Sequence, residues 1–229
     1  MTQSPDDQFD DQYDWEDDYT ELHLEDATYA DFDWDTLDPE ITARHDAILD
    51  MSPEELDAID PEVLDDFQRW AAARAWLGHD NPTHFIELTR RILDTPPADR
   101  SKLLSYPDLM LALARALAAE GQTPRAMVLL DEYGRQEGAD PLELARHRGL
   151  LMLEDGRGDE GLKILLDAIK ANAADEPEIG LHFAQDLLDL GHKPQARALL
   201  EATREIAAAR ADAELLREVE DTIAAYLAD

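Results

Sequence analysis

A repeat of 35 residues constrains the fold of this chain more than any other feature of its sequence. Gly121, Gly156 and Gly191 lie 35 residues apart. Other positions keep the same step: Leu117, Met152 and Leu187; Ala126, Gly161 and Ala196; Leu130, Leu165 and Leu200. Glycine ends a helix at little cost, and proline three residues later, as in Pro124 and Pro194, suits the first turn of the next helix. Each repeat is therefore predicted to be a helical hairpin, and such hairpins must stack to bury their apolar faces.

The chain beyond about residue 51 also has a helical pattern. Ala, Leu, Arg and Glu dominate it, apolar residues recur at spacings of three and four, and no segment alternates like a strand. Ser52-Pro53-Glu54-Glu55 has the form of a capping box, and Asp60-Pro61-Glu62 repeats the start signal. We therefore predict an all-α fold, an α-solenoid of stacked antiparallel hairpins over residues 51–229. The hairpins are expected at about 62–94, 107–138, 141–173 and 177–209, followed by a capping helix over 211–227.

The repeat resembles the tetratricopeptide repeat family. If units begin at residues 107, 142 and 177, the family's conserved positions hold residues of suitable size. The small residues fall at Ala114, Gly149 and Ala184 and at Ala126, Gly161 and Ala196, and the large one falls at Leu117, Met152 and Leu187. The resemblance covers residues 107–210. Leu, Met or Ala fill most of the family's aromatic positions, and the step exceeds the usual 34 by one, so a related helical-hairpin solenoid stays open.

The resemblance implies that first helices line a concave groove that binds peptides. The positions that would face this groove are Leu111, Arg115, Glu143, Arg146, Leu150, Leu153, Leu181, Gln185 and Leu188. The family's clamp for a C-terminal carboxylate uses Lys and Asn, but its positions here hold Leu111, Arg115, His147, Glu178 and His182. A co-chaperone role is therefore not expected, and an apolar groove with two arginines suits an extended or helical segment.

Residues 1–50 differ from the rest of the chain in charge. Residues 1–40 contain 16 Asp or Glu and no Lys or Arg, and self-repulsion predicts a largely disordered acidic arm. Spaced aromatic residues could anchor this arm on a surface: Phe9, Tyr13, Trp15, Tyr19, Phe32 and Trp34. Three roles stay open: a solubilising tail, docking on a partner, and docking in the protein's own groove, where Arg115 and Arg146 would meet its carboxylates.

The composition excludes several classes of function. The net charge of −34 repels nucleic acids and anionic membranes, so no direct nucleic-acid partner is expected. The chain has no cysteine for disulfides, thiolate metal sites or nucleophilic catalysis. It has neither a secretory signal pattern nor an apolar run of the roughly 20 residues that span a bilayer. We therefore expect a cytoplasmic protein without membrane contact.

Two motifs have a simpler explanation than ligand binding. Residues 156–161 read G-x-G-x-x-G, but a helix precedes them where a dinucleotide site needs a strand, and the turn of a repeat accounts for the glycines. Asp31-x-Asp33-x-Asp35 begins like a calcium loop, but Thr36 and Thr42 replace its essential glycine and glutamate.

Two Glu–His pairs consist of side chains that can bind zinc or a similar ion. Glu143 and His147 are four residues apart, and Glu178 and His182 repeat the pair 35 residues later. Two diverged copies of one repeat would produce the same coincidence, so we expect no metal site and no cofactor. If a metal is bound, these four side chains are its candidate ligands.

No motif for catalysis is present, and the four serines lack a nucleophile setting, so no enzyme is expected. The sequence instead predicts a protein-interaction module that holds a protein or peptide partner in its groove. The alternative is an acidic charge-mimic or chaperone that acts on a basic partner through the arm.

Overall fold

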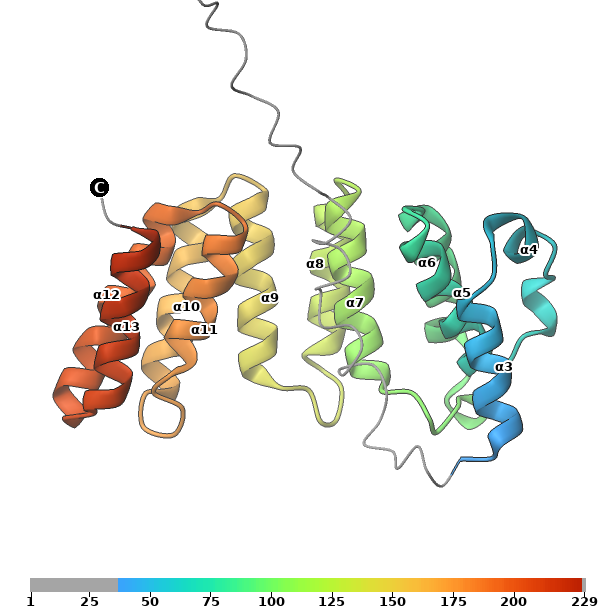
Figure 1. Ribbon diagram of the computed structural model, residues 1–229, viewed down its shortest axis with the longest axis horizontal. Coiled ribbons are helices and arrows are strands. Elements are labelled where there is room, and N and C mark those ends of the chain that lie inside the picture. Colours follow the sequence, from blue (N-terminus) through green and yellow to red (C-terminus); the bar gives the residue numbers. More distant parts are fainter. Residues whose placement is uncertain (1–36, 228–229) are drawn as a thin grey trace, which may run out of the picture. The chain divides into compact units, whose positions relative to one another are not determined.

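The computed structural model describes residues 37–227, and its regular elements are all helical over that range (Figure 1). This confirms the all-α prediction. The chain divides into two compact units, Met1–Ala116 (unit 1) and Leu117–Asp229 (unit 2). None of the helices in the described part of the chain has the length and apolar character that crossing a membrane requires.

From residue 37 on, the first element of unit 1 is a helix that the sequence analysis assigned to the arm. Its elements are α3 (Pro39–Leu49), α4 (Pro53–Asp57), the short 3-10 helix η2 (Pro61–Val63), α5 (Asp66–Gly78), α6 (Pro82–Asp94), the short 3-10 helix η3 (Pro97–Asp99) and α7 (Tyr106–Ala119), whose last turn extends into unit 2. Asp38 caps α3, and Pro39 occupies its first turn. The packed part of the chain therefore starts before residue 51. Helix α3 buries His45 and Ile48. The sequence analysis missed these two side chains because they follow directly on a strongly acidic segment.

Local capping sets the starts of the next helices. Ser52 and Glu55 form the predicted capping box of α4, in which the Ser52 hydroxyl accepts from the Glu55 backbone N–H. The start signal at residues 60–62 produces only the single turn of η2, and α5 begins at Asp66, after a second capping box between Asp65 and Gln68.

Helices α5 and α6 pack as a pair around aromatic side chains. The rings of Trp70 and Phe85 meet edge to face with centroids 5.6 Å apart, and both are fully buried with Ile92. Near the turn that connects the two helices, the rings of Trp76 and His84 stack with their centroids 4.3 Å apart. Helix α3 and the first part of α7 pack against this core.

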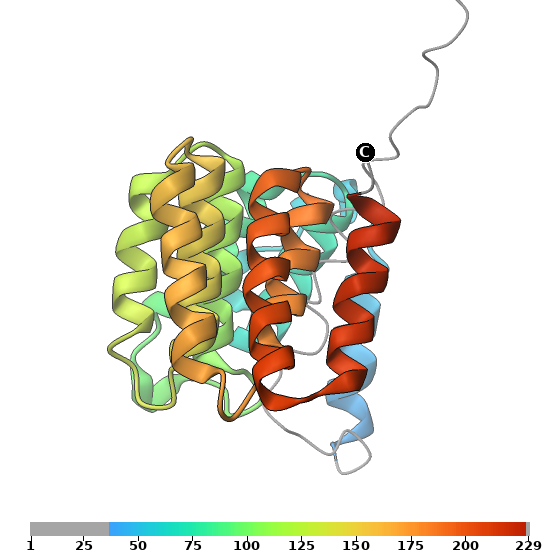
Figure 2. The same cartoon turned by 90° about the vertical axis from the view of Figure 1, so that its left-hand side faces the viewer.

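After the last turn of α7, the described part of unit 2 contains six helices. They are α8 (Thr123–Tyr133), α9 (Pro141–Glu154), α10 (Gly158–Asn172), α11 (Ile179–Asp189), α12 (Lys193–Arg210) and α13 (Ala213–Tyr226). Helix α9 pairs with α10 and α11 pairs with α12, and α12 also packs against α13, whose ribbon lies beside it in Figures 1 and 2. Fully buried Phe183, Leu187 and Leu200 lie at the centre of the core that α9 to α13 share.

The three repeat glycines close their helices in the same way. Gly121, Gly156 and Gly191 all have positive φ, between 70° and 78°. After each of them, a backbone N–H donates to the carbonyl oxygen five residues earlier: Gln122 to Leu117, Arg157 to Met152 and His192 to Leu187, at 2.7–2.8 Å. This is the Schellman arrangement, which satisfies carbonyl groups that the helix end would leave unpaired. The same helix-ending turn therefore recurs every 35 residues, as the sequence repeat predicts.

Glycines also allow α9 and α10 to approach each other closely. A Cβ atom on Gly161 would lie 2.5 Å from the carbonyl oxygen of Gly149, and one on Gly149 would lie 2.5 Å from Leu165 Cγ. In the following hairpin, Ala184 and Ala196 occupy the corresponding positions and are fully buried. The absence of both side chains therefore brings α9 nearer to α10 than alanine would allow.

The end of α12 offers a stabilising substitution. Ala211 has a left-handed backbone, with φ 54° and ψ 33°, and the next N–H closes a bond to the Ala207 carbonyl oxygen. Because this conformation costs residues with a Cβ atom roughly 1–2 kcal/mol, we expect Ala211→Gly to raise the free energy of unfolding by about 1 kcal/mol. Urea denaturation followed by circular dichroism measures it. Ala208→Gly, at an exposed helical position, should instead lower stability by about 1 kcal/mol, and a loss at both positions would contradict the explanation.

Candidate functional site

An arginine joins two successive first helices in unit 2. Arg146 of α9 donates from Nε to Asp186 Oδ2 and from Nη2 to Asp186 Oδ1 of α11, both at 2.7 Å. The same guanidinium lies 3.4 Å from Glu143 Oε2, one turn earlier on α9. Hydrogen bonds to Asp186 are the largest cause that raises the pKa of Arg146. The two parallel bonds fix the guanidinium in one plane, so α9 and α11 are joined at a defined point.

Glu143 and His147 lie next to this ion pair on α9. Burial raises the pKa of Glu143, while the charge of Arg146 opposes the shift. His147 is buried, and its Nδ1 lies 3.0 Å from the carbonyl oxygen of Glu143, so this nitrogen carries the hydrogen and donates. The His147 ring is therefore held by its own helix.

The predicted groove residues differ in what they offer a ligand. Leu150, Leu181 and Leu188 are partly buried and pack against the unit 2 core, whereas Leu153 is only 4 % exposed. Gln185 is partly exposed and donates from Nε2 to Asp189 Oδ1 at 3.0 Å. The partly exposed leucines thus leave part of their apolar surface accessible, and Leu153 belongs to the core.

We call one set of these side chains the α9–α11 face. It comprises Glu143, Arg146, Leu150, Leu181, Gln185, Asp186 and Leu188. Spacings of three, four and seven residues place Glu143, Arg146 and Leu150 along one side of α9. The same spacings place Leu181, Gln185 and Leu188 along one side of α11, and Asp186, next to Gln185, joins the two rows through its pair with Arg146. The sequence analysis found six of these seven residues as groove positions, Glu143 among them. It missed Asp186, because nothing local distinguishes that carboxylate from its many neighbours.

The other predicted groove residues lie in unit 1. Leu111 is 7 % exposed, and Arg115 is partly buried and has contacts of its own. The candidate positions are thus divided between the two compact units. The aromatic anchors of the arm, Phe9, Tyr13, Trp15, Tyr19, Phe32 and Trp34, lie outside the described residues.

The structure does not gather the candidate metal ligands. Within residues 37–227 no group of three or more His, Asp or Glu side chains could hold a metal ion. Glu143 and His147 contact each other, but Glu178 occupies the N-cap position of α11 without a side-chain capping bond, and His182 is exposed on that helix. The four side chains from two repeats therefore do not converge on one point.

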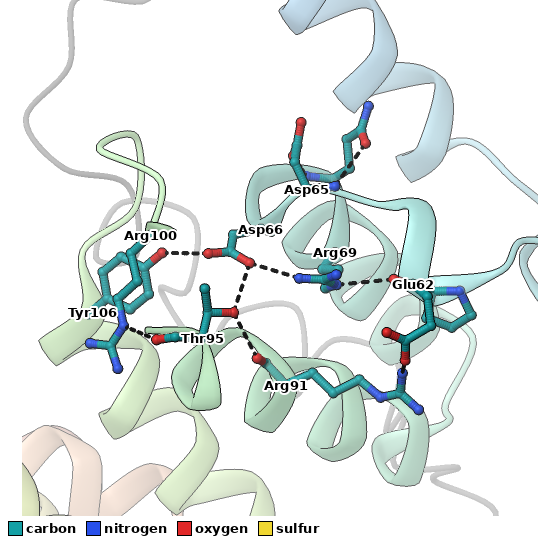
Figure 3. A network of polar contacts seen from close by, with 10 residues as sticks. Glu62, Asp65, Asp66, Arg69, Arg91, Thr95, Arg100 and Tyr106 are labelled. Carbon is teal, nitrogen blue, oxygen red and sulfur yellow. Dashed lines mark hydrogen bonds and ion pairs between the residues drawn. The ribbon is translucent and has the colours of Figure 1, made fainter. Parts of the chain in front are cut away.

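A second polar network surrounds a buried carboxylate in unit 1 (Figure 3). Asp66, 5 % exposed, accepts from the Tyr106 hydroxyl at 3.0 Å and from Arg69 Nη1 at 2.9 Å. The Thr95 hydroxyl lies 3.3 Å from its Oδ1. The guanidinium of Arg100 lies 4.7 Å from the centre of the Tyr106 ring. Burial and the charge of Asp66 raise the pKa of Tyr106 well above its usual range.

This network joins α5 to α6 and α7 through hydrogen bonds within the protein. Arg100 donates to the carbonyl oxygens of Thr95 and Leu93, at 2.8 and 2.6 Å, and Arg69 Nε donates to that of Pro61 at 3.1 Å. Each charged group thus has protein partners, which is what a buried structural carboxylate requires. The sequence analysis missed the network because Tyr106 lies 40 residues from Asp66.

Comparison of this chain with protein-family models, with curated proteins and with solved structures found no match.

The link between α9 and α11 is measurable as a coupling energy. Arg146→Ala and Asp186→Ala are each expected to destabilise unit 2. A double-mutant cycle should give a coupling of about 1 kcal/mol, because the pair is bidentate and largely shielded from water. Circular dichroism in urea provides the four free energies. The exposed Arg157–Glu160 pair is the matched control and should show no measurable coupling, and equal coupling at both pairs would contradict the assigned role.

Proposed function

We propose that this protein is an interaction module in which tetratricopeptide-like hairpins form an α-solenoid and the α9–α11 face binds a segment of a partner protein. The observation that carries the proposal is the Arg146–Asp186 pair, which joins the first helices of two successive repeats beside partly exposed leucines. A face built by two repeats has a fixed shape, and partly exposed leucines on such a face suit an extended or helical peptide.

The bound segment is expected to provide apolar anchors. Leu150, Leu181 and Leu188 would contact these anchors, while Glu143 and Gln185 at the margin would contact polar groups. Arg146 already binds Asp186, so a carboxylate on the partner would have to compete with an intramolecular bidentate pair. The proposal therefore favours a partner whose main contacts are apolar, in the cytoplasm, and assigns no catalytic step.

Site-specific cross-linking tests the proposal. A benzophenone amino acid replaces Gln185 on the α9–α11 face in one variant and Lys163 on α10, which is also accessible, in another. A partner that cross-links at residue 185, fails to cross-link at residue 163 and is lost in the Arg146→Ala variant supports the proposal. Equal labelling at both positions overturns it.

The same experiment distinguishes the alternative, in which the acidic arm binds a basic partner. It is repeated with a chain that begins at residue 37, which keeps the Asp38 cap of α3, at low and at high salt. Binding through leucines should survive both the truncation and the salt. Loss on truncation together with steep salt dependence would favour the charge-mimic function and place binding on residues 1–36.

A further inference from the structure

A titratable side chain helps to hold helix α3 against α5. The two buried side chains of α3 are His45 and Ile48. The ring of His45 is only 4 % exposed and stacks on the ring of Phe67 of α5, with centroids 4.6 Å apart and an angle of 26° between the planes. Helix α3 therefore docks through His45 and Ile48, with the partly buried Leu49 beside them.

The surroundings of His45 favour the neutral imidazole. Burial lowers the pKa of His45 and is the largest cause, and the positive charge of Arg74 on α5 acts in the same direction. Asp46, the next residue on α3, opposes them, with Oδ1 3.3 Å from His45 Nδ1. The side chain of Asp46 is 64 % exposed, so water screens its charge.

We infer that helix α3 is a pH-sensitive clasp, which docks on α5 when His45 is neutral and is released when its ring gains a proton. In the released helix His45 has the usual histidine pKa of about 6.5, whereas in the docked helix it is lower. The released form therefore binds more protons in this range. Docking is strongest above about pH 6.5 and weakens as the pH falls below it.

The clasp lies at a junction in the chain. Residues 1–36, which contain 14 Asp or Glu and no Lys or Arg, immediately precede the described part. Helix α3 is the first described helix of unit 1 and follows them directly in the chain. Its release would uncover Phe67 and free the point at which the acidic segment is attached. Acidification would thus change the N-terminal part of the protein without unfolding the pair of α5 and α6.

Hydrogen exchange on the full-length protein tests this inference. Exchange of α3 amides is measured at pH 7.5 and 5.5 and corrected for the intrinsic rates. The equilibrium constant for release is expected to rise by up to about tenfold between these values, because only the range below pH 6.5 contributes. Amides of α12 provide the internal control and should change less. Equal protection of α3 at both pH values overturns the inference.

A variant assigns the effect to one residue. His45→Phe keeps a ring against Phe67 but cannot take up a proton, so its α3 protection should be independent of pH. If acidification lowers the protection of α3 in His45→Phe as much as in the unmodified protein, the inference is overturned.

A direct NMR titration of His45 in the unmodified protein provides a test that does not require the variant to fold. In the intact protein, His45 must titrate at lower pH than in a peptide of residues 38–50, and an equal or higher midpoint overturns the clasp.

Discussion

Gly161→Ala is expected to lower the free energy of unfolding of unit 2 by about 1–3 kcal/mol, although alanine is the better helix former. The new Cβ atom would lie 2.5 Å from the carbonyl oxygen of Gly149 and 2.9 Å from Leu153 Cγ. The first neighbour is backbone and cannot rotate away. Helices α9 and α10 must therefore separate, which loosens the packing of Leu165 of α10 against Gly149 of α9.

Gly158→Ala is the matched control in the same helix. A Cβ atom there would make ordinary contacts, at 3.5 Å to Gln195 Nε2 and 4.0 Å to Leu153 Cδ2. This substitution should be neutral or slightly stabilising. Circular dichroism in urea reports both variants. Tryptophan fluorescence should be insensitive to them, because all four tryptophans lie within the first 76 residues of the chain. Equal stability of Gly161→Ala and Gly158→Ala would show that the helices do not meet as described.

Asp66→Ala is expected to destabilise unit 1 by about 3–5 kcal/mol, the cost of removing one partner from a buried ion pair. The substitution leaves Arg69 without its carboxylate and the Tyr106 hydroxyl without its acceptor. It also removes the group that connects α5 to α7, so the start of α7 should become less protected. Trp70 and Trp76 lie on the same helix as Asp66, and their fluorescence in urea measures the loss directly.

Asp65→Ala provides the comparison, since the two aspartates are adjacent but have different roles. Asp65 is exposed and accepts from the Gln68 backbone N–H at 2.8 Å, so its loss should cost about 1 kcal/mol. Tyr106→Phe removes one hydrogen bond to a charged group and should cost roughly 1.5–3 kcal/mol. If Asp66→Ala costs no more than Asp65→Ala, the buried network is not what holds unit 1 together.

Local interactions explain why the sequence predicted the turns. A Schellman turn involves six residues, and its left-handed position favours glycine whatever the rest of the chain does. The spacing of Gly121, Gly156 and Gly191 was therefore sufficient to predict three helix ends. The same locality explains the capping box at Ser52. It also explains the misplaced start at residues 60–62, where an equally good local signal leads to only one turn.

The candidate site was predictable only in part. The repeat placed Arg146, Leu150 and Leu181 on first helices because a 35-residue step brings equivalent positions to equivalent faces. The partner of Arg146 was not predictable, because Asp186 lies 40 residues away among many similar carboxylates. The Glu–His pairs illustrate the reverse error. They match in sequence, yet Glu143 and His147 contact each other while His182 stays exposed.

The sequence by itself determined the helical class, the repeat step and the conformation of the turns, since these depend on residues within one or two helical turns of each other. Tertiary structure decided which charges are buried and which elements dock. It placed Asp66 inside and Asp65 outside, paired Arg146 with Asp186, and packed His45 of an acidic segment against Phe67. Those outcomes depend on contacts between residues far apart in the chain, where the cost of removing a charge from water is balanced by partners that no local pattern identifies.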